Sequence, residues 1–127
     1  MITFEEVGTI LDDIAEELPG EFYKELNGGI ILLPDAKMHP ESRPPDELYI
    51  LGEYYNEPRG LGRYIAIYYG SFIRSYAYAS PPRQKEELRR VLLHEFTHHI
   101  ESLAGERGLE IKDGADLERY RRGLIDN

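Results

Sequence analysis

The sequence predicts a single α+β domain, because a helical pattern at each end of the chain encloses a middle section with strand patterning. Apolar residues recur at intervals of three and four over residues 4–18 and again over residues 81–103. Between these stretches, short apolar runs are separated by glycine and proline. The 127 residues can bury one hydrophobic core but not two, so one domain over residues 1–127 is expected.

The first predicted helix runs from Phe4 to Leu18 and is amphipathic. Acidic residues fill its polar face, Thr3 is placed to cap its start, and Pro19-Gly20 ends it. Its other face is apolar and is expected to pack on a core. It consists of Phe4, Val7, Ile10, Leu11, Ile14 and Leu18.

Three strands are predicted in the middle section, at Ile30–Leu33, Leu48–Tyr55 and Arg63–Tyr69. The prolines and charges of residues 34–47 predict a surface loop between the first two strands. The segment Phe72–Ala79 is compatible with a further strand or with an extended connection.

A long helix is predicted over Pro81–Leu103. Ser80 is a favourable cap for it, and Pro81 occupies the first helical position, where no N–H is needed. Gly105 is expected to end this helix, and a short last helix is expected at Ala115–Arg122.

The composition excludes several classes of function. The chain has no cysteine, which excludes disulfides and thiolate catalysis and leaves His and carboxylates as the strong metal ligands. Its net charge of −9 disfavours nucleic acid and anionic lipid as partners. No apolar run approaches the roughly 20 residues of a membrane span, and the acidic N-terminus does not resemble a signal peptide. A cytoplasmic protein is therefore expected, with its oligomeric state open.

The most informative pattern is His94-Glu95-Phe96-Thr97-His98, which matches the HExxH motif of zinc peptidases. Positions i and i+4 of a helix lie about 40° apart around its axis, so both imidazoles can reach one tetrahedral zinc ion. Such a zinc lowers the pKa of a bound water toward roughly 7, and an adjacent carboxylate can take the proton of that water. The motif therefore predicts His94 and His98 as metal ligands and Glu95 as the general base.

A helical wheel places these residues relative to the core. His94, His98 and Glu101 fall opposite an apolar arc, and Glu95 lies at the border of that arc. His99 falls within the arc. We therefore expect it to be buried or to support the site from behind, in preference to binding zinc directly. The arc itself consists of Leu88, Val91, Leu92, Phe96, Ile100 and Leu103.

The pattern leaves the third metal ligand open. Catalytic zinc generally has three protein ligands and one position for water. Glu101 lies three residues after His98 on nearly the same face and is either a ligand or a solvated charge. His39, alone in a polar loop, is expected to be exposed. The other candidates follow the Gly105 turn and are Glu106, Glu110, Asp113 and Asp116.

The double histidine of His94-Glu95-Phe96-Thr97-His98-His99 resembles a family of minimal, single-domain bacterial zincin-like metallopeptidases, long catalogued as a domain of unknown function. The likeness covers most of the chain. The further segments that carry it are Phe4-Glu5-Glu6-Val7, Leu18-Pro19, Leu51-Gly52-x-Tyr54 and Ile67-Tyr68-x-Gly70-x-x-Ile73.

This resemblance implies a compact zincin-like fold with zinc as cofactor, in which a small mixed sheet packs against an N-terminal helix and a long active-site helix. An edge strand of such a sheet can hold an extended peptide. The resemblance also implies His94 and His98 as zinc ligands and Glu95 as general base. Family members often carry Gly and then a metal-binding Asp after the double histidine. Here Glu101 and Ala104 stand at those positions, which shifts the expected third ligand to Glu101 or the later acids.

The leading hypothesis is a zinc metallopeptidase that hydrolyses a peptide or protein substrate by water attack. The strand near Tyr64–Tyr69 is expected to bind this substrate in extended form. A second hypothesis is a protein-interaction module that binds metal without hydrolysis, and a third is a structural domain whose motif is accidental.

Overall fold

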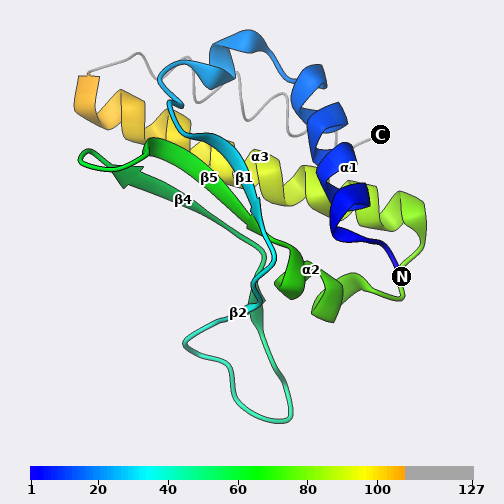
Figure 1. The fold of residues 1–127 in the computed structure, drawn as a ribbon. Helices are drawn as coiled ribbons and strands as arrows, with labels where there is room; N and C mark the ends of the chain where they lie inside the picture. The colour runs from blue at the N-terminus through cyan, green and yellow to red at the C-terminus, as the bar shows by residue number, and fades with distance from the viewer. Residues whose placement is uncertain (108–127) are drawn as a thin grey trace.

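A computed structural model describes residues 1–107 of the chain, and Figure 1 shows their arrangement. Helices and strands alternate around a small sheet, so the predicted α+β class is confirmed. The last helix expected from the sequence, Ala115–Arg122, lies outside the described residues. The elements in chain order are α1 (Phe4–Glu17), the 3-10 helix η1 (Gly20–Tyr23), β1 (Gly29–Leu33), β2 (Lys37–Met38), β3 (Tyr49–Ile50), β4 (Gly52–Glu57), β5 (Gly62–Tyr68), α2 (Tyr69–Tyr76) and α3 (Pro81–Arg107).

The main sheet has three strands in the order β1-β5-β4. Strand β1 runs parallel to β5, whereas β4 runs antiparallel to it, so the sheet is mixed as expected. Strand β5 therefore has a neighbour on each side, while β4 has one edge that no other strand of residues 1–107 pairs with. Strands β2 and β3 pair with each other in a separate arm that projects from the body (Figure 1).

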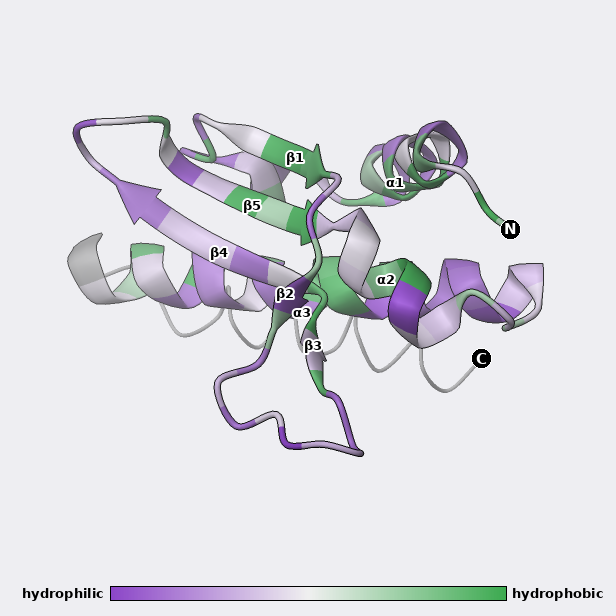
Figure 2. Ribbon diagram, turned by 60° about the horizontal axis from the view of Figure 1, so that its bottom comes forward, coloured by the Kyte–Doolittle hydropathy of each residue, from purple (hydrophilic) through white to green (hydrophobic). Residues whose placement is uncertain are grey.

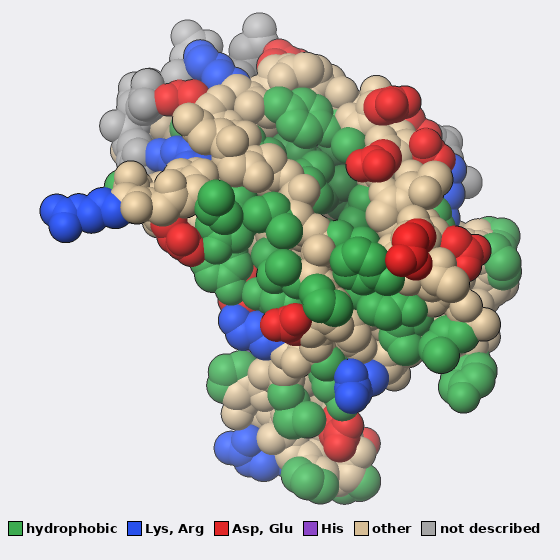
Figure 3. All heavy atoms as spheres, in the orientation of Figure 1, with side chains coloured by type: hydrophobic (Ala, Val, Ile, Leu, Met, Phe, Trp, Pro, Cys, Tyr) green, Lys and Arg blue, Asp and Glu red, His purple; other side chains and the backbone are tan. Residues whose placement is uncertain are grey.

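Helices cover one face of this sheet, as the view in Figure 2 shows for α3. The buried isoleucines of β5, Ile65 and Ile67, share one core with apolar residues of α1 and α3. Among the described residues no helix covers the other face. In the view of Figure 3, hydrophobic side chains gather beside the acidic residues of α1. The helical residues of the core are Val7, Leu11, Ile14, Leu88, Leu92, Phe96 and Ile100.

Both predicted helix starts are confirmed. The Thr3 hydroxyl accepts a hydrogen bond from the Glu6 N–H, and the Glu6 carboxylate accepts one from the Thr3 N–H, which completes a capping box. At α3 the Ser80 hydroxyl accepts from the Arg83 N–H at 3.4 Å. The expected end of this helix is wrong, because α3 continues through Gly105 to Arg107. One glycine costs a helix only about 1 kcal/mol, and the buried Leu103 anchors the turn before it.

The middle of the chain departs from the prediction in three places. Residues 69–76 form helix α2 and no extended segment, because apolar residues at helical spacing place Phe72 in the core. The strand expected at Leu48–Tyr55 is divided at Leu51 into β3 and β4. The loop expected at 34–47 contains β2, which is two residues long and becomes a strand only by pairing with β3.

None of the helices over residues 1–107 combines the length and the apolar character that a membrane span requires.

Candidate metal centre

A cleft of about 650 Å³ lies between the edge strand β4 and helix α3. It is open to solvent along α3, and its walls combine imidazoles, carboxylates and hydroxyls. The residues that line it are Gly52, Glu53 and Tyr54 from β4 and His94, Glu95, His98, Glu101 and Ser102 from α3. The whole HExxH motif except its two spacer residues therefore faces one cleft.

The two histidines of the motif converge at the rim of this cleft. Both side chains are exposed, and the Nε2 atoms of His94 and His98 lie 3.2 Å apart. Two nitrogens that bind one tetrahedral zinc at about 2.0–2.1 Å lie roughly 3.3 Å apart. The observed spacing thus fits a shared metal ion with little movement of either ring, and imidazole nitrogens suit zinc.

Glu95 lies deeper in the same cleft. Its side chain is only 6% exposed, and no hydrogen bond or ion pair holds its carboxylate among the described residues. Burial, together with the negative charge of Glu53, raises the pKa of Glu95 to about 7. A buried carboxylate without a partner, with a pKa near neutrality, is suited to take up and release a proton.

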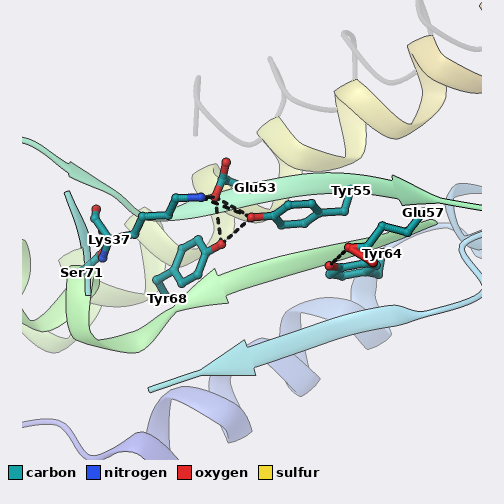
Figure 4. A network of polar contacts seen from close by, with 7 residues as sticks. All are labelled: Lys37, Glu53, Tyr55, Glu57, Tyr64, Tyr68 and Ser71. Carbon is teal, nitrogen blue, oxygen red and sulfur yellow. Dashed lines mark hydrogen bonds and ion pairs between the residues drawn. The ribbon is translucent and has the colours of Figure 1, made fainter. Parts of the chain in front are cut away.

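Glu53 stands beside Glu95 and is held as an anion. Its Oε1 atom accepts hydrogen bonds from the Tyr55 and Tyr68 hydroxyls, both at 2.8 Å, and it forms an ion pair with Lys37 (Figure 4). Burial alone raises the pKa of Glu53, but these three donors outweigh burial and lower it overall. Because Glu53 stays ionised, it favours the protonated form of Glu95.

His99 is a structural residue, as the wheel predicted. It is 0% exposed, and its two ring nitrogens are both engaged. Its Nε2 lies 2.8 Å from the Lys24 carbonyl oxygen, and its Nδ1 lies 2.9 Å from the Tyr54 hydroxyl. Burial lowers the pKa of His99. With no free nitrogen, it is not available to a metal in the cleft.

The third metal ligand is not found in the described part of the chain. Over residues 1–105, whose side chains the structure describes, no three His, Asp or Glu side chains form a group that could hold a metal ion. Glu101 is exposed and lines the cleft, but it does not complete such a group with the histidine pair. Glu106 belongs to the last turn of α3. The remaining candidates, Glu110, Asp113 and Asp116, lie outside the described residues.

Four residues that line the cleft were not predicted as site residues from the sequence: Gly52, Glu53, Tyr54 and Ser102. Gly52 allows β4 to approach α3, because a Cβ atom there would lie 2.9 Å from Cγ1 of Val91 and 3.0 Å from Cδ1 of Ile67. Tyr54 and Ser102 also line the cleft, although neither residue belongs to the HExxH motif. Because side chains alternate along a strand, the sequence indicates that Gly52 and Tyr54 share one face of β4. It does not show that this face packs against α3.

His39 is not the free surface residue that its loop suggested. It is half-buried, and its Nδ1 accepts a hydrogen bond from the Glu41 N–H at 3.0 Å. It lies in the arm and does not line the cleft.

A solved structure resembles this chain along most of its length. It is a conserved hypothetical protein from Thermus thermophilus with 34% sequence identity and a TM-score of 0.70, and the match covers 82% of this chain and 99% of that one. The chain belongs to the family of this protein. No protein-family model and no curated protein matches the chain. Since this relationship names no activity, the chemistry of the cleft has to indicate the function.

Proposed function

We propose that the protein is a zinc-dependent metallopeptidase with a zincin-like fold. The observation that supports this most is the pair of Nε2 atoms of His94 and His98, 3.2 Å apart, next to the buried and unpartnered carboxylate of Glu95. All three side chains line one cleft beside a free strand edge. This combination matches what zinc-assisted hydrolysis needs: ligands, a base and a place for an extended substrate.

In this proposal His94, His98 and Glu101 hold the zinc ion. The two imidazoles have the spacing of ligands on one ion. Glu101 is the exposed carboxylate of α3 in their cleft, and its side chain would have to turn toward them to complete the group. When bound, zinc would supply a Lewis acid and a water with a lowered pKa. The later acids, Glu110, Asp113 and Asp116, are alternatives to Glu101.

Glu95 acts as the proton carrier. One of its Oε atoms accepts a proton from the attacking water as the C–O bond forms, and the same atom then gives that proton to the leaving nitrogen as the C–N bond breaks. Its pKa near 7 suits both directions at neutral pH. The low exposure of Glu95 keeps bulk water from competing for the proton.

The free edge of β4 binds the substrate in extended form. The Arg63 carbonyl points to the β1 side of β5, where it accepts from the Gly28 N–H, whereas the Tyr68 N–H donates to Leu51 on the β4 side. Because these directions alternate along β5, Gly52 and Tyr54 direct their N–H and C=O groups away from the sheet. An extended peptide can pair with these groups next to the metal pair.

This assignment corrects the strand expected to bind substrate. Tyr64–Tyr68 belong to β5, which is paired on both sides and has no free edge. Only an edge strand can accept a further strand. Binding of a peptide or protein substrate, a location in the cytoplasm and the absence of nucleic-acid and membrane partners remain proposals.

The second candidate is a protein-interaction module that binds metal without hydrolysis. It is favoured by one observation, which is that the described residues supply two metal ligands and no complete group of three. A site with two histidines can link or order a partner without activating water.

Activity of matched variants separates these functions. Zinc-loaded wild-type protein should cleave members of a peptide library, and Glu95→Gln should lower cleavage by at least about 10²-fold with unchanged zinc content. Glu86→Gln, an exposed position on the outer side of the same helix, is the control and should leave cleavage unchanged. Full activity of Glu95→Gln would refute the proposed mechanism, and no cleavage by zinc-loaded wild type would favour the interaction module.

A further inference from the structure

A chain of four polar side chains connects the back of the cleft to the core. Arg63 Nη1 donates to the Tyr54 hydroxyl at 3.0 Å and to the Ser102 hydroxyl at 2.6 Å. The Tyr54 hydroxyl also contacts Nδ1 of His99 at 2.9 Å. Tyr54 and Ser102 line the cleft, whereas Arg63 and His99 are buried behind it.

The hydrogen positions in this set of hydrogen bonds follow from which groups can only donate and which can only accept. The Lys24 carbonyl can only accept, so the proton of the neutral His99 ring is on Nε2. Nδ1 of His99 is then an acceptor, and the Tyr54 hydroxyl must direct its hydrogen to it. Tyr54 therefore has no hydrogen left to offer to the cleft.

Ser102 is in the opposite situation. A guanidinium can only donate, so the Ser102 oxygen accepts from Arg63 and keeps its own hydrogen for another partner. Serine and threonine in helices often donate to the carbonyl four residues earlier. Thr97 does so, with Leu93 at 3.0 Å, but no such bond is found for Ser102 among the described residues. Of the two hydroxyl-bearing residues that line the cleft, only Ser102 has a hydrogen that the bonds above do not use.

The position of Ser102 relative to the proposed site is favourable. It lies four residues after His98 and seven after Glu95 on α3, so all three side chains are on one face of the helix. Its hydroxyl is polarised by a cation that is itself only 8% exposed, and a donor in such surroundings is stronger than one in water.

We infer that Ser102 is a catalytic residue whose hydroxyl donates a hydrogen bond to the substrate carbonyl oxygen on which negative charge develops. This inference rests on the proposed peptidase function. Arg63 is a positioning residue that holds and polarises Ser102, and Tyr54 with His99 fixes Arg63. Among the described residues that line the cleft, the hydroxyl groups belong to Tyr54 and Ser102, and the hydrogen of Tyr54 is already directed to His99.

The test compares Ser102→Ala with Ser102→Thr, which keeps the hydroxyl, and with Ser75→Ala, an exposed serine of α2 outside the cleft. Loss of one oxyanion donor lowers kcat by about 10²-fold. We expect a loss of this order for Ser102→Ala with KM within about twofold, substantial recovery in Ser102→Thr, and wild-type values for Ser75→Ala. Zinc content should be equal in all variants, and Ser102→Ala should melt below wild type, because it removes an acceptor of the buried Arg63.

A binding measurement gives a second readout that does not depend on turnover. Calorimetry with a phosphinic pseudo-peptide, whose tetrahedral group mimics the charged oxygen, should show weaker binding to Ser102→Ala by the factor lost in kcat. Equal phosphinic affinity, or kcat within twofold of wild type while Glu95→Gln is inactive, would overturn the role of Ser102 and leave the proposed function standing. Full activity of Glu95→Gln would overturn both.

Discussion

Gly52→Ala tests whether the close approach of β4 to α3 creates the site. The added Cβ would lie 2.9 Å from Cγ1 of Val91, 3.0 Å from Cδ1 of Ile67 and 3.2 Å from the Ala66 carbonyl oxygen. Ordinary contacts begin at 3.4 Å, so the shortfalls are 3.4 − 2.9 = 0.5 Å, 3.4 − 3.0 = 0.4 Å and 3.4 − 3.2 = 0.2 Å. Because the third neighbour is backbone of the central strand, β4 has to move outward by several tenths of an ångström.

The expected cost of this overpacking is about 1–3 kcal/mol in the free energy of unfolding. Urea denaturation measures it, with Gly20→Ala as the control, since no atom lies within 4 Å of the added Cβ there. Displacement of the edge strand should also lower kcat/KM, because misplacement of about 1 Å can cost about 10²-fold. Val91→Ala in the same chain removes one clash and should recover part of both losses. Wild-type stability together with wild-type activity of Gly52→Ala would refute this reasoning.

Three further outcomes follow from the structure. Burial tends to raise the pKa of Glu87, but hydrogen bonds from Arg90 and a neighbouring tyrosine lower it below 4.5 overall. The folded state therefore binds fewer protons than the unfolded state, so stability is lost as pH falls below about 4.5. In Glu87→Gln, the denaturation midpoint should fall less steeply as the pH is lowered below about 4.5. A midpoint that falls as steeply as in the wild type would contradict this. Tyr54→Phe leaves Nδ1 of the buried His99 without its donor and should cost about 1–3 kcal/mol, whereas Tyr78→Phe, at a fully exposed side chain, should cost nothing measurable. Zinc at a hundredfold excess over its Kd should stabilise the fold by about 2.7 kcal/mol, and thermal melts that do not respond to chelator would argue against a zinc site.

Helices α1 and α3 and the histidine pair could be predicted because local patterns specify them. The capping box at Thr3 and Glu6 and the serine cap at Ser80 are formed between residues close in sequence. The helical period alone places His94 and His98 together and His99 in the core. These features need no knowledge of other segments.

Features that depend on partners distant in sequence could not be predicted. Strand β2 is defined by pairing with β3, and Gly52 matters only because α3 lies against it. The chain of hydrogen bonds from Arg63 to Ser102 joins residues 39 positions apart. The free edge of β4 follows from strand order, which a pattern of apolar residues does not specify.

The most direct test of the proposed function is the zinc content of purified, tag-free protein, measured beside the variant in which His94 and His98 are both alanine. We predict one zinc per wild-type chain, coordinated by two imidazoles at about 2.0–2.1 Å in X-ray absorption, and no bound zinc in the variant. Wild-type protein that contains no stoichiometric zinc, and takes none up on dialysis, would contradict the central claim.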